Sequence, residues 1–416
     1  MVYTYPGFLA LLLPALAAAQ QISTAVPEKH LKLPTQKCTL KDGCKTFETA
    51  VVHDALWRKL HKVDDPSTPC WLGSPDCTDV EACAKNCALE GVDYAVRGVA
   101  TEGDAITLSQ FVKAPDGSLT VGSPRVFLVA PDGKNYEPFK LLNQEFTFDV
   151  DLSKLVCGMN GALVIGEMDM TGARSELNPA GAEYGTGYCD AQCAQHDWIE
   201  GIANIDHKYG ACCNEMDIWE SNSLSQALTP HSCNITGLYK CTSEEECGQD
   251  VGVCDEWGCS YNPYLNGAHD YYGPGLKVDT KRKFTVKTIF VTDNGEATGT
   301  LTEIQRVYIQ DGKVIENQST TVGGEEVSAI TDGYCNATAS WFQQRGGLPT
   351  MGEAIQRGMV LHMVIWNHPD TFMNWLDSGD AGPCNATEGD PAFIEKNHPD
   401  TAVTFSNFKW GDIGST

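Results

Sequence analysis

Short apolar segments recur along the chain, and they constrain its fold more than any other feature. In most of them apolar and polar residues alternate, which is typical of β-strands because successive side chains point to opposite faces of a sheet. Turn residues separate the segments, as at Ala130 to Gly133 and Gln310 to Gly312, and predict hairpins there. The predicted strands span residues 125–130, 146–150, 162–167, 284–292, 301–310, 359–366 and 403–410.

Helical periodicity is scarce by comparison. The two predicted helices run from Asp79 to Glu90, with Asp79 as the N-cap, and from Met351 to Arg357. Many strands with few helices predict an all-β domain of two packed antiparallel sheets. The 416 residues contain no internal repeat and no linker, so we expect one large domain over residues 20–416.

Residues 1–19 are predicted to form a secretory signal peptide. An apolar run from Phe8 to Ala19 is too short to span a membrane and ends in three alanines before Gln20, where we expect cleavage. The segment lacks the Lys or Arg that usually precedes such a run. The chain ends at Thr416 soon after its last predicted strand, so we expect no tether or accessory module. The mature protein is therefore expected to be soluble, secreted and extracellular.

Charge and cysteine content limit the possible partners and compartments. The formal net charge of -26 argues against nucleic acid and anionic membranes as partners. All 18 cysteines follow the predicted signal peptide, and this even number predicts up to nine disulfides. Zinc binding at Cys83 and Cys87, or at Cys189 and Cys193, is the alternative, but export favours disulfides. Sequons predict glycosylated surface loops at Asn234, Asn317, Asn336 and Asn385.

The most distinctive polar stretch of the sequence holds three carboxyl groups. On an extended strand, Glu215 and Asp217 point to the same face of a sheet. Glu220 lies five residues after Glu215, so strict alternation would place it on the opposite face. We predict a β-bulge near Ile218 and Trp219, which would aim all three carboxyl groups into one groove. The alternative is a solvated acidic stretch in an acidic protein.

Paired carboxyl groups are suited to glycoside hydrolysis. Retaining glycosidases hold two of them about 5 to 5.5 Å apart, whereas inverting enzymes leave room for a water molecule between them. The sequence leaves both geometries open, because the bulge decides the distance between the Glu215 and Glu220 carboxyl groups. Like charges held close raise one pKa, so one Glu can stay protonated near neutrality while the other is ionised.

The acidic stretch also carries a family resemblance. Residues Asn214 to Glu220, followed by Ala227 to His231, resemble the signature of glycoside hydrolase family 7, the fungal endoglucanases and cellobiohydrolases. Further matching stretches lie at residues 185–193, 271–275, 374–379, 405–407 and 411–416. The resemblance therefore extends over essentially the whole mature chain.

The resemblance implies a fold and a reaction. The fold would be a β-jelly roll sandwich with a long concave groove, and the reaction hydrolysis of β-1,4-glucan with retention of configuration. Glu215 matches the nucleophile, Glu220 the acid/base and Asp217 a residue that hydrogen-bonds Glu215. His231 matches an active-site histidine beside the acid/base, although a His satisfied within its own turn is a simpler interpretation. This mechanism requires no metal and no organic cofactor, and it predicts a bell-shaped pH profile with an acidic optimum.

Substrate-binding residues are implied in the same way. Aromatic faces suit the C–H faces of glucose rings, and polar groups suit their hydroxyls. Trp57 matches the distal glycone end, Trp366 the glycone subsites and Trp375 the leaving-group side. The matching polar groove residues are Asn160, Tyr188, Asp190 and Gln192.

Alternatively, Tyr188 and Asp190 only hold the strand beside Cys189. The resemblance also implies three disulfides that would keep the groove rigid: Cys189 with Cys213, Cys193 with Cys212, and Cys157 with Cys384.

Loop lengths favour the endo-acting branch of the family. Residues 193–212 form a short segment, residues 378–384 lack the insertion of cellobiohydrolases, and Lys59 stands where those enzymes tend to have a tunnel-entrance Trp. Residues 233–259 are longer than in the shortest endoglucanases, so one edge of the groove is expected to be partly covered. Val164 stands where many members have Tyr. We therefore expect a monomeric endo-β-1,4-glucanase; an exo-acting cellobiohydrolase and a non-catalytic glucan-binding lectin are the alternatives.

Overall fold

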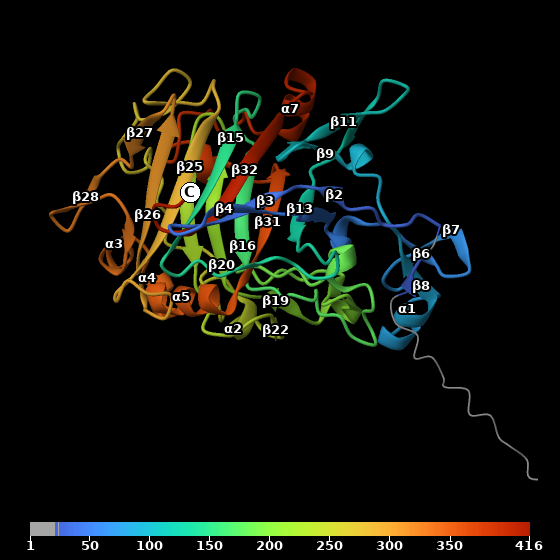
Figure 1. The fold of residues 1–416 in the computed structure, drawn as a ribbon. Coiled ribbons are helices and arrows are strands. Elements are labelled where there is room, and N and C mark those ends of the chain that lie inside the picture. The colour runs from blue at the N-terminus through green and yellow to red at the C-terminus, as the bar shows by residue number, and fades with distance from the viewer. Residues whose placement is uncertain (1–20, 24) are drawn as a thin grey trace, which may run out of the picture.

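Two large β-sheets form the centre of the protein (Figure 1). The structure is a computed structural model that describes residues 21–23 and 25–416, so the predicted signal peptide lies outside the described residues. Neighbouring strands in both sheets are antiparallel, apart from β3 (Thr35–Thr39), which runs parallel to β32 (Ala402–Asp412). The predicted all-β sandwich of two antiparallel sheets is confirmed, with this one parallel pair added.

One sheet has ten strands. Alongside β3 and β32 it contains β4 (Gly43–Phe47), which pairs with β3, and β30 (Ile330–Thr331), which pairs with β26. The main path, in spatial order, is β27 (Lys313–Glu316), β26 (Leu301–Gln310), β25 (Phe284–Thr292), β15 (Gln144–Asp151), β32, β10 (Ala105–Ser109) and β9 (Val99–Glu102).

The other sheet has eight strands and carries the acidic stretch. Its β14 (Pro138–Phe139) pairs with β31. The main path, in spatial order, is β2 (Leu31–Lys32), β5 (Ala50–His53), β13 (Arg125–Val129), β31 (Met359–Trp366), β16 (Asn160–Gly166), β20 (Glu215–Ser221) and β21 (Gln226–His231).

All seven strands predicted from the sequence are present. The bounds of β25, β26 and β31 agree with the prediction, while β13 and β16 each end one residue earlier than predicted. The predicted turn after β26 is a two-residue hairpin, since Gln310 pairs with Lys313 and both intervening residues have positive φ, 53° at Asp311 and 72° at Gly312. Such φ values characterise the type I′ turn that suits the twist of a hairpin.

The two predicted helices exist with different lengths. α1 (Val80–Asn86) begins where expected, because the Asp79 side chain accepts a hydrogen bond from the Ala82 N–H at 2.8 Å. The predicted extension to Glu90 is wrong, since the buried residues after Asn86 form β8 (Cys87–Leu89), which pairs with β6 (Leu60–Lys62). α5 (Gly347–Arg357) begins four residues before the predicted start. The helices that the sequence did not predict are α2 (Glu244–Cys247), α3 (Asp332–Thr338), α4 (Ser340–Gln344), α6 (Asn374–Asp377) and α7 (Pro391–Asn397).

Outside the two large sheets, β1 (Gln21–Ile22), β8, β6 and β7 (Asp65–Cys70) form a four-stranded sheet, and the other short strands form two-stranded pairs. β6, β8 and α1 lie at one end of the molecule in Figure 1, and α3 to α5 lie at the opposite end. The strands of these pairs are β11 (Phe111–Lys113), β12 (Leu119–Val121), β17 (Trp198–Ile199), β18 (Ile202–Ala203), β19 (Gly210–Cys212), β22 (Tyr239–Cys241), β23 (Tyr272–Gly273), β24 (Val278–Asp279), β28 (Thr320–Val322) and β29 (Glu325–Val327).

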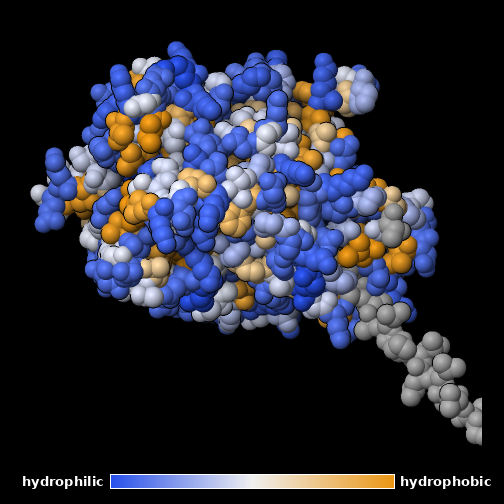
Figure 2. All heavy atoms as spheres, viewed as in Figure 1, coloured by the Kyte–Doolittle hydropathy of each residue, from blue (hydrophilic) through white to orange (hydrophobic). Residues whose placement is uncertain are grey.

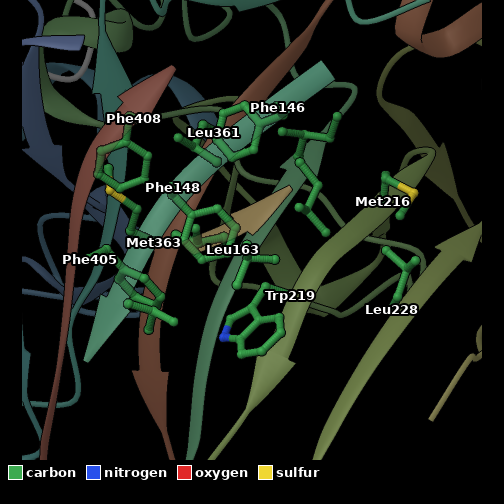
Figure 3. Packing of buried hydrophobic residues seen from close by; sticks show 14 of the residues in the cluster. Phe146, Phe148, Leu163, Met216, Trp219, Leu228, Leu361, Met363, Phe405 and Phe408 are labelled. Atoms are coloured by element: carbon green, nitrogen blue, oxygen red, sulfur yellow. The ribbon is translucent and has the colours of Figure 1, made fainter. Parts of the chain in front are cut away.

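The apolar faces of the two sheets enclose one large core. Figure 3 shows Trp219 and Leu163 of the eight-stranded sheet close to Phe148 of the ten-stranded sheet. The Trp219 and Phe148 ring centres are 6.0 Å apart in an edge-to-face arrangement, which is a favourable geometry for aromatic pairs. The face drawn in Figure 2 is largely hydrophilic, with hydrophobic residues in small separate groups. No helix in the described part of the chain is long and apolar enough to cross a membrane.

All 18 cysteines are paired in disulfides, as predicted. The cysteines considered for zinc therefore cannot act as thiolate ligands: Cys83 pairs with Cys77, and Cys87 with Cys70. The three pairs implied by the family resemblance are confirmed. The complete set is Cys38–Cys44, Cys70–Cys87, Cys77–Cys83, Cys157–Cys384, Cys189–Cys213, Cys193–Cys212, Cys233–Cys254, Cys241–Cys247 and Cys259–Cys335.

Candidate active site

The predicted bulge is present in β20. Two consecutive residues of β16 pair with Trp219 and Asp217, which leaves Ile218 as the extra residue. The pairing of β20 with β21 also shifts between Asp217 and Glu220. Because one residue is added, Glu220 returns to the face of the sheet that carries Glu215 and Asp217.

Glu215 is held in place by residues 189–191, which lie beside the start of β20. Its Oε2 accepts a hydrogen bond from the Ala191 N–H at 2.9 Å, and the residue is only 7% exposed. The backbone of Asp190 accepts a hydrogen bond from the Cys213 N–H at 2.9 Å. The disulfide between Cys189 and Cys213 joins the same two segments. The position of the Glu215 carboxyl group is therefore fixed by backbone and covalent contacts.

Glu220 is held by an amide on the neighbouring strand. The Nδ2 of Asn160 donates to Glu220 Oε1 at 2.8 Å, and the Oδ1 of Asn160 accepts from the Ser221 N–H at 3.0 Å. Asn160 is fully buried at the start of β16. With both ends of the amide engaged, its N–H can only face Glu220.

His231 lies between two acceptors. Its Nε2 is 2.9 Å from Asp217 Oδ2, and its Nδ1 is 2.9 Å from the backbone oxygen of Asp255. Burial lowers the pKa of His231, but the Asp217 carboxylate outweighs burial and raises it to about 10. The ring is therefore an imidazolium that donates from both nitrogens. The expected hydrogen bond from Asp217 to Glu215 is replaced by this contact to His231.

The carboxyl cluster retains protons at neutral pH. Burial raises the pKa of Glu220 to about 8, and the charge of Asp217 adds to the effect. Burial also raises the pKa of Glu215, as do the charges of Asp217 and Asp190, while the His231 cation and the Ala191 N–H favour the ionised form of Glu215. The raised pKa of Glu220 suits a proton donor, while the His231 cation and the Ala191 N–H favour the carboxylate form that Glu215 needs to act as a nucleophile.

Tyr188 and Asp190 extend the site along the sheet. The charges of Asp190 and Glu215 both act on Tyr188, and burial raises the pKa of its phenol far enough that it keeps its proton. The guanidinium carbon of Arg125 lies 3.3 Å from the Tyr188 ring centre, and an ion pair of 2.6 Å joins Arg125 to Asp54. These contacts link the carboxyl cluster on β20 to β13 through largely buried polar side chains.

Two of the predicted aromatic residues lie next to each other. Trp366 ends β31, where it pairs with Asn160, and its ring centre is 6.4 Å from that of Trp375. Trp375 belongs to α6 and is 47% exposed. An aromatic surface therefore adjoins the strand position that holds Glu220.

Trp57 and Lys59 line a cleft of about 1000 Å³ whose lining includes none of the three carboxyl groups. Gln192 is exposed, and its side chain makes no hydrogen bond within the described residues. Val164 is buried on β16 and pairs with Asp217. The structure therefore gathers Glu215, Asp217, Glu220, His231, Asn160, Tyr188 and Asp190, and leaves Trp57 and Gln192 outside this cluster.

A model of the family described as glycosyl hydrolase family 7 matches residues 22–416. The chain belongs to this family. It is 55% identical over 413 residues to "Probable endo-beta-1,4-glucanase celB" of Aspergillus terreus, a match that covers 98% of this chain and 97% of that protein.

Solved structures of family 7 proteins share the fold. The native endocellulase EGI of Humicola insolens is 45% identical with a TM-score of 0.89, over 95% of this chain and 100% of that one. A family 7 cellobiohydrolase from Daphnia pulex is 37% identical with the same TM-score of 0.89, over 95% of this chain and 100% of that one. The fold is thus shared by a protein named as an endocellulase and one named as a cellobiohydrolase.

Several residues that complete this family 7 site were not predicted from the sequence. Arg125 covers Tyr188, Ala191 supplies a backbone N–H, and Asp255 supplies a backbone oxygen to His231. Backbone donors and acceptors carry no signal in side-chain identity. Arg125 did have a signal, since it is a charged residue at the start of a strand that is otherwise apolar.

Proposed function

We propose that this family 7 protein is a secreted endo-β-1,4-glucanase that hydrolyses internal bonds of cellulose and related β-glucans with retention of configuration. The observation that carries the proposal is the bulge in β20, which brings Glu215 and Glu220 to one face of the strand. The name of the A. terreus relative supports endo action, and the cellobiohydrolase from D. pulex is less similar, at 37% identity.

In the first step, the Glu215 carboxylate attacks the anomeric carbon and the bond from that carbon to the leaving oxygen breaks. Glu220 gives its proton to the leaving oxygen, which departs as a free hydroxyl at the new chain end. The raised pKa of Glu220, about 8, keeps this proton available at neutral and acidic pH. Asn160 aims the Glu220 carboxyl group through its 2.8 Å hydrogen bond.

In the second step, the Glu220 carboxylate takes a proton from water while the water oxygen attacks the anomeric carbon. The bond to Glu215 breaks, and both residues return to their starting states. The His231 imidazolium lies 2.9 Å from Asp217 Oδ2 and offsets negative charge beside the two glutamates. No metal or cofactor enters either step.

Substrate contacts follow from the aromatic and polar residues around the cluster. We assign Trp366 to the glycone subsites, Trp375 to the leaving-group side and Trp57 to the distal glycone end. Tyr188, Asp190 and Gln192 would bind sugar hydroxyls, and the exposed position of Gln192 suits a contact made only with substrate.

Endo action is supported by how the loops beside the site are tied down. The segment after α6 is a compact turn, in which the Ala381 N–H donates to the Ser378 oxygen at 3.1 Å and Cys384 pairs with Cys157. The segment between Cys193 and Cys212 is closed by their own disulfide. Short, fastened loops favour an open groove that admits the middle of a chain.

The function can be tested on soluble carboxymethylcellulose. An endo-acting enzyme lowers the viscosity quickly relative to the reducing ends it releases, and NMR during the first minutes should show the β-anomer of the product. Slow loss of viscosity with cellobiose as nearly the sole product would favour the exo-acting alternative. Binding to glucan without hydrolysis would favour a lectin.

Secretion and a monomeric state are part of the same proposal. Nine disulfides are typical of proteins that mature in oxidising compartments. Expression of the full chain in a fungal host, with recovery of activity from the medium and size-exclusion chromatography of the product, tests both points. Activity retained inside the cells, or elution at twice the expected mass, would contradict them.

A further inference from the structure

An exposed tryptophan outside the cluster described above lines the same cleft as Trp57. Trp71 follows directly after β7 and is 56% exposed, close to the 57% of Trp57. Both line the cleft of about 1000 Å³, together with the side chain of Trp198. By contrast, Trp219 and Trp410 are fully buried in the core. Large apolar side chains left exposed within a concave surface mark binding sites more often than chance exposure does.

The segment that carries Trp71 is rigid. The preceding residue, Cys70, is joined to Cys87, and the turn that follows ends at Cys77, which is joined to Cys83. Within the turn, the Ser74 N–H donates to the Trp71 oxygen at 2.9 Å. The backbone of Trp71 is therefore held in place before any ligand arrives, which lowers the entropic cost of binding.

Two residues of the cleft lie next to the candidate active site. Arg125 and His196 line the cleft. The same two residues contact Tyr188: the Arg125 guanidinium carbon lies 3.3 Å and the His196 ring centre 5.5 Å from the centre of its ring. Tyr188 in turn is close enough to Glu215 for the Glu215 charge to raise the pKa of its phenol. A chain bound at Glu215 and directed along this surface would reach Trp57 and Trp71.

We infer that Trp71 is a further sugar-binding residue, which supplies a second aromatic surface beside Trp57 at the far end of the cleft. The inference rests on the proposed function and specifies it: the enzyme should favour glucan chains long enough to reach this end. An indole face packs against the C–H face of a glucose ring, while Asp93, Arg97 and Asp197 of the cleft can bond the hydroxyls.

The test compares long and short substrates in Trp71→Ala. For cellohexaose and soluble β-glucan we expect kcat/KM to fall about tenfold, mainly because KM rises. The variant loses the stacking of one indole ring on a glucose ring. For an aryl β-cellobioside, which occupies only the subsites next to Glu215, kcat/KM should stay within twofold of the wild type. Trp71→Phe keeps an aromatic face and should recover most of the loss. Phe393→Ala is the matched control, because Phe393 is an exposed aromatic residue on α7 that does not line the cleft.

Other results would overturn either the assignment of Trp71 alone or the proposed function as well. An equal loss on short and long substrates, or no loss on either, would overturn the assignment of Trp71 while leaving the proposed function intact. Wild-type protein that hydrolyses no β-1,4-glucan would overturn the proposed function, and the assignment with it. Thermal unfolding of each variant, with melting temperatures close to that of the wild type, ensures that the kinetic changes reflect binding.

Discussion

A guanidinium nitrogen of Arg306 donates a hydrogen bond to the carbonyl oxygen of Ile218, the extra residue of the bulge in β20. Arg306 belongs to β26 in the other sheet, so this contact crosses the core. Arg306 is 3% exposed, and burial lowers the pKa of its guanidinium group. The guanidinium carbon lies 5.4 Å from the centre of the Trp219 ring. A bulge leaves a backbone group without its ladder partner, and here a buried cation supplies the missing donor.

Replacing Arg306 should lower activity strongly while changing stability little. In Arg306→Met we expect kcat to fall about tenfold or more, because the bulge that positions Glu220 loses its donor. The free energy of unfolding should change by only about 1 kcal/mol, since removal of a buried charge offsets the loss of the hydrogen bond to Ile218. The measurements are kcat on an aryl cellobioside and urea unfolding. Arg306→Lys retains a donor and should recover part of kcat; a Met variant with wild-type kcat would show that the contact does not position the site.

The two glutamates should differ in their dependence on the leaving group. Glu215→Gln should lose about 10⁴-fold or more in kcat on every substrate, because no nucleophile remains. Glu220→Gln should lose far more on cellotriose than on 2,4-dinitrophenyl cellobioside, since a good leaving group departs without a proton. Glu316→Gln, which alters an exposed carboxyl group on β27, is the control and should keep the wild-type rate.

A Glu215→Gln variant with the full rate would mean that another residue is the nucleophile. A Glu220→Gln variant that loses equally on both substrates would mean that Glu220 does not protonate the leaving oxygen.

Stability should fall as the pH rises from mildly acidic to alkaline. Folded Glu220 keeps its proton up to about pH 8, whereas an unfolded Glu loses it near pH 4.3. Between these values the folded state binds more protons than the unfolded state, so the free energy of unfolding decreases with pH. His231 continues the trend, because its folded pKa of about 10 lies above its ordinary value of 6.5. Activity should also decline above about pH 8, as Glu220 loses its proton.

Urea midpoints at pH 5, 6.5 and 8 test this prediction, and Glu220→Gln should flatten their decline between pH 5 and 8. His53 acts in the opposite sense, since burial lowers its pKa to about 4, and the stability it contributes is lost as the pH falls below 6.5. Midpoints that rise steadily from pH 5 to 8 would contradict the carboxyl assignment.

Removal of the disulfide whose cysteines are farthest apart in sequence should cost more stability than removal of one whose cysteines are close in sequence. Cys157 and Cys384 are separated by 227 residues, and Cys241 and Cys247 by only 6. Loop entropy predicts a loss of about 5.5 kcal/mol when both cysteines of the long pair are replaced by serine, and about 2 kcal/mol for the short pair. Guanidinium unfolding of the two double variants measures the difference. Equal losses would show that contacts such as the 2.7 Å hydrogen bond from the Gly158 N–H to Asp377, rather than the disulfide, join these segments.

Features with a local cause could be predicted from the sequence. The phase of Glu220 relative to Glu215 required an extra residue near Ile218, and the structure has it there. Strand positions followed from alternation, and the hairpin at Asp311 followed from a turn dipeptide. The first residue of α1 followed from a capping side chain at Asp79.

Features with a distant cause could not be predicted. The end of α1 is set by strand pairing of Cys87 with Lys62 and by its disulfide to Cys70, and neither partner is visible in helical periodicity. The contact between Arg306 and Ile218 joins residues 88 positions apart in two sheets. The Nδ1 of His231 contacts the Asp255 backbone oxygen 24 residues away, a contact that no side-chain pattern signals.

The place of β32 in the sheet has a consequence for biogenesis. Residues 402–412 lie between β15 and β10, and β3 runs along part of the same strand, so a late segment of the chain completes the interior of the ten-stranded sheet. Until that segment leaves the ribosome and docks, the edges of β10 and β15 stay open to pairing with other chains. Hairpins such as β25 with β26, and disulfides that span few residues, can form earlier. Chains truncated before residue 402 are therefore expected to aggregate or to be retained by quality control rather than to be exported.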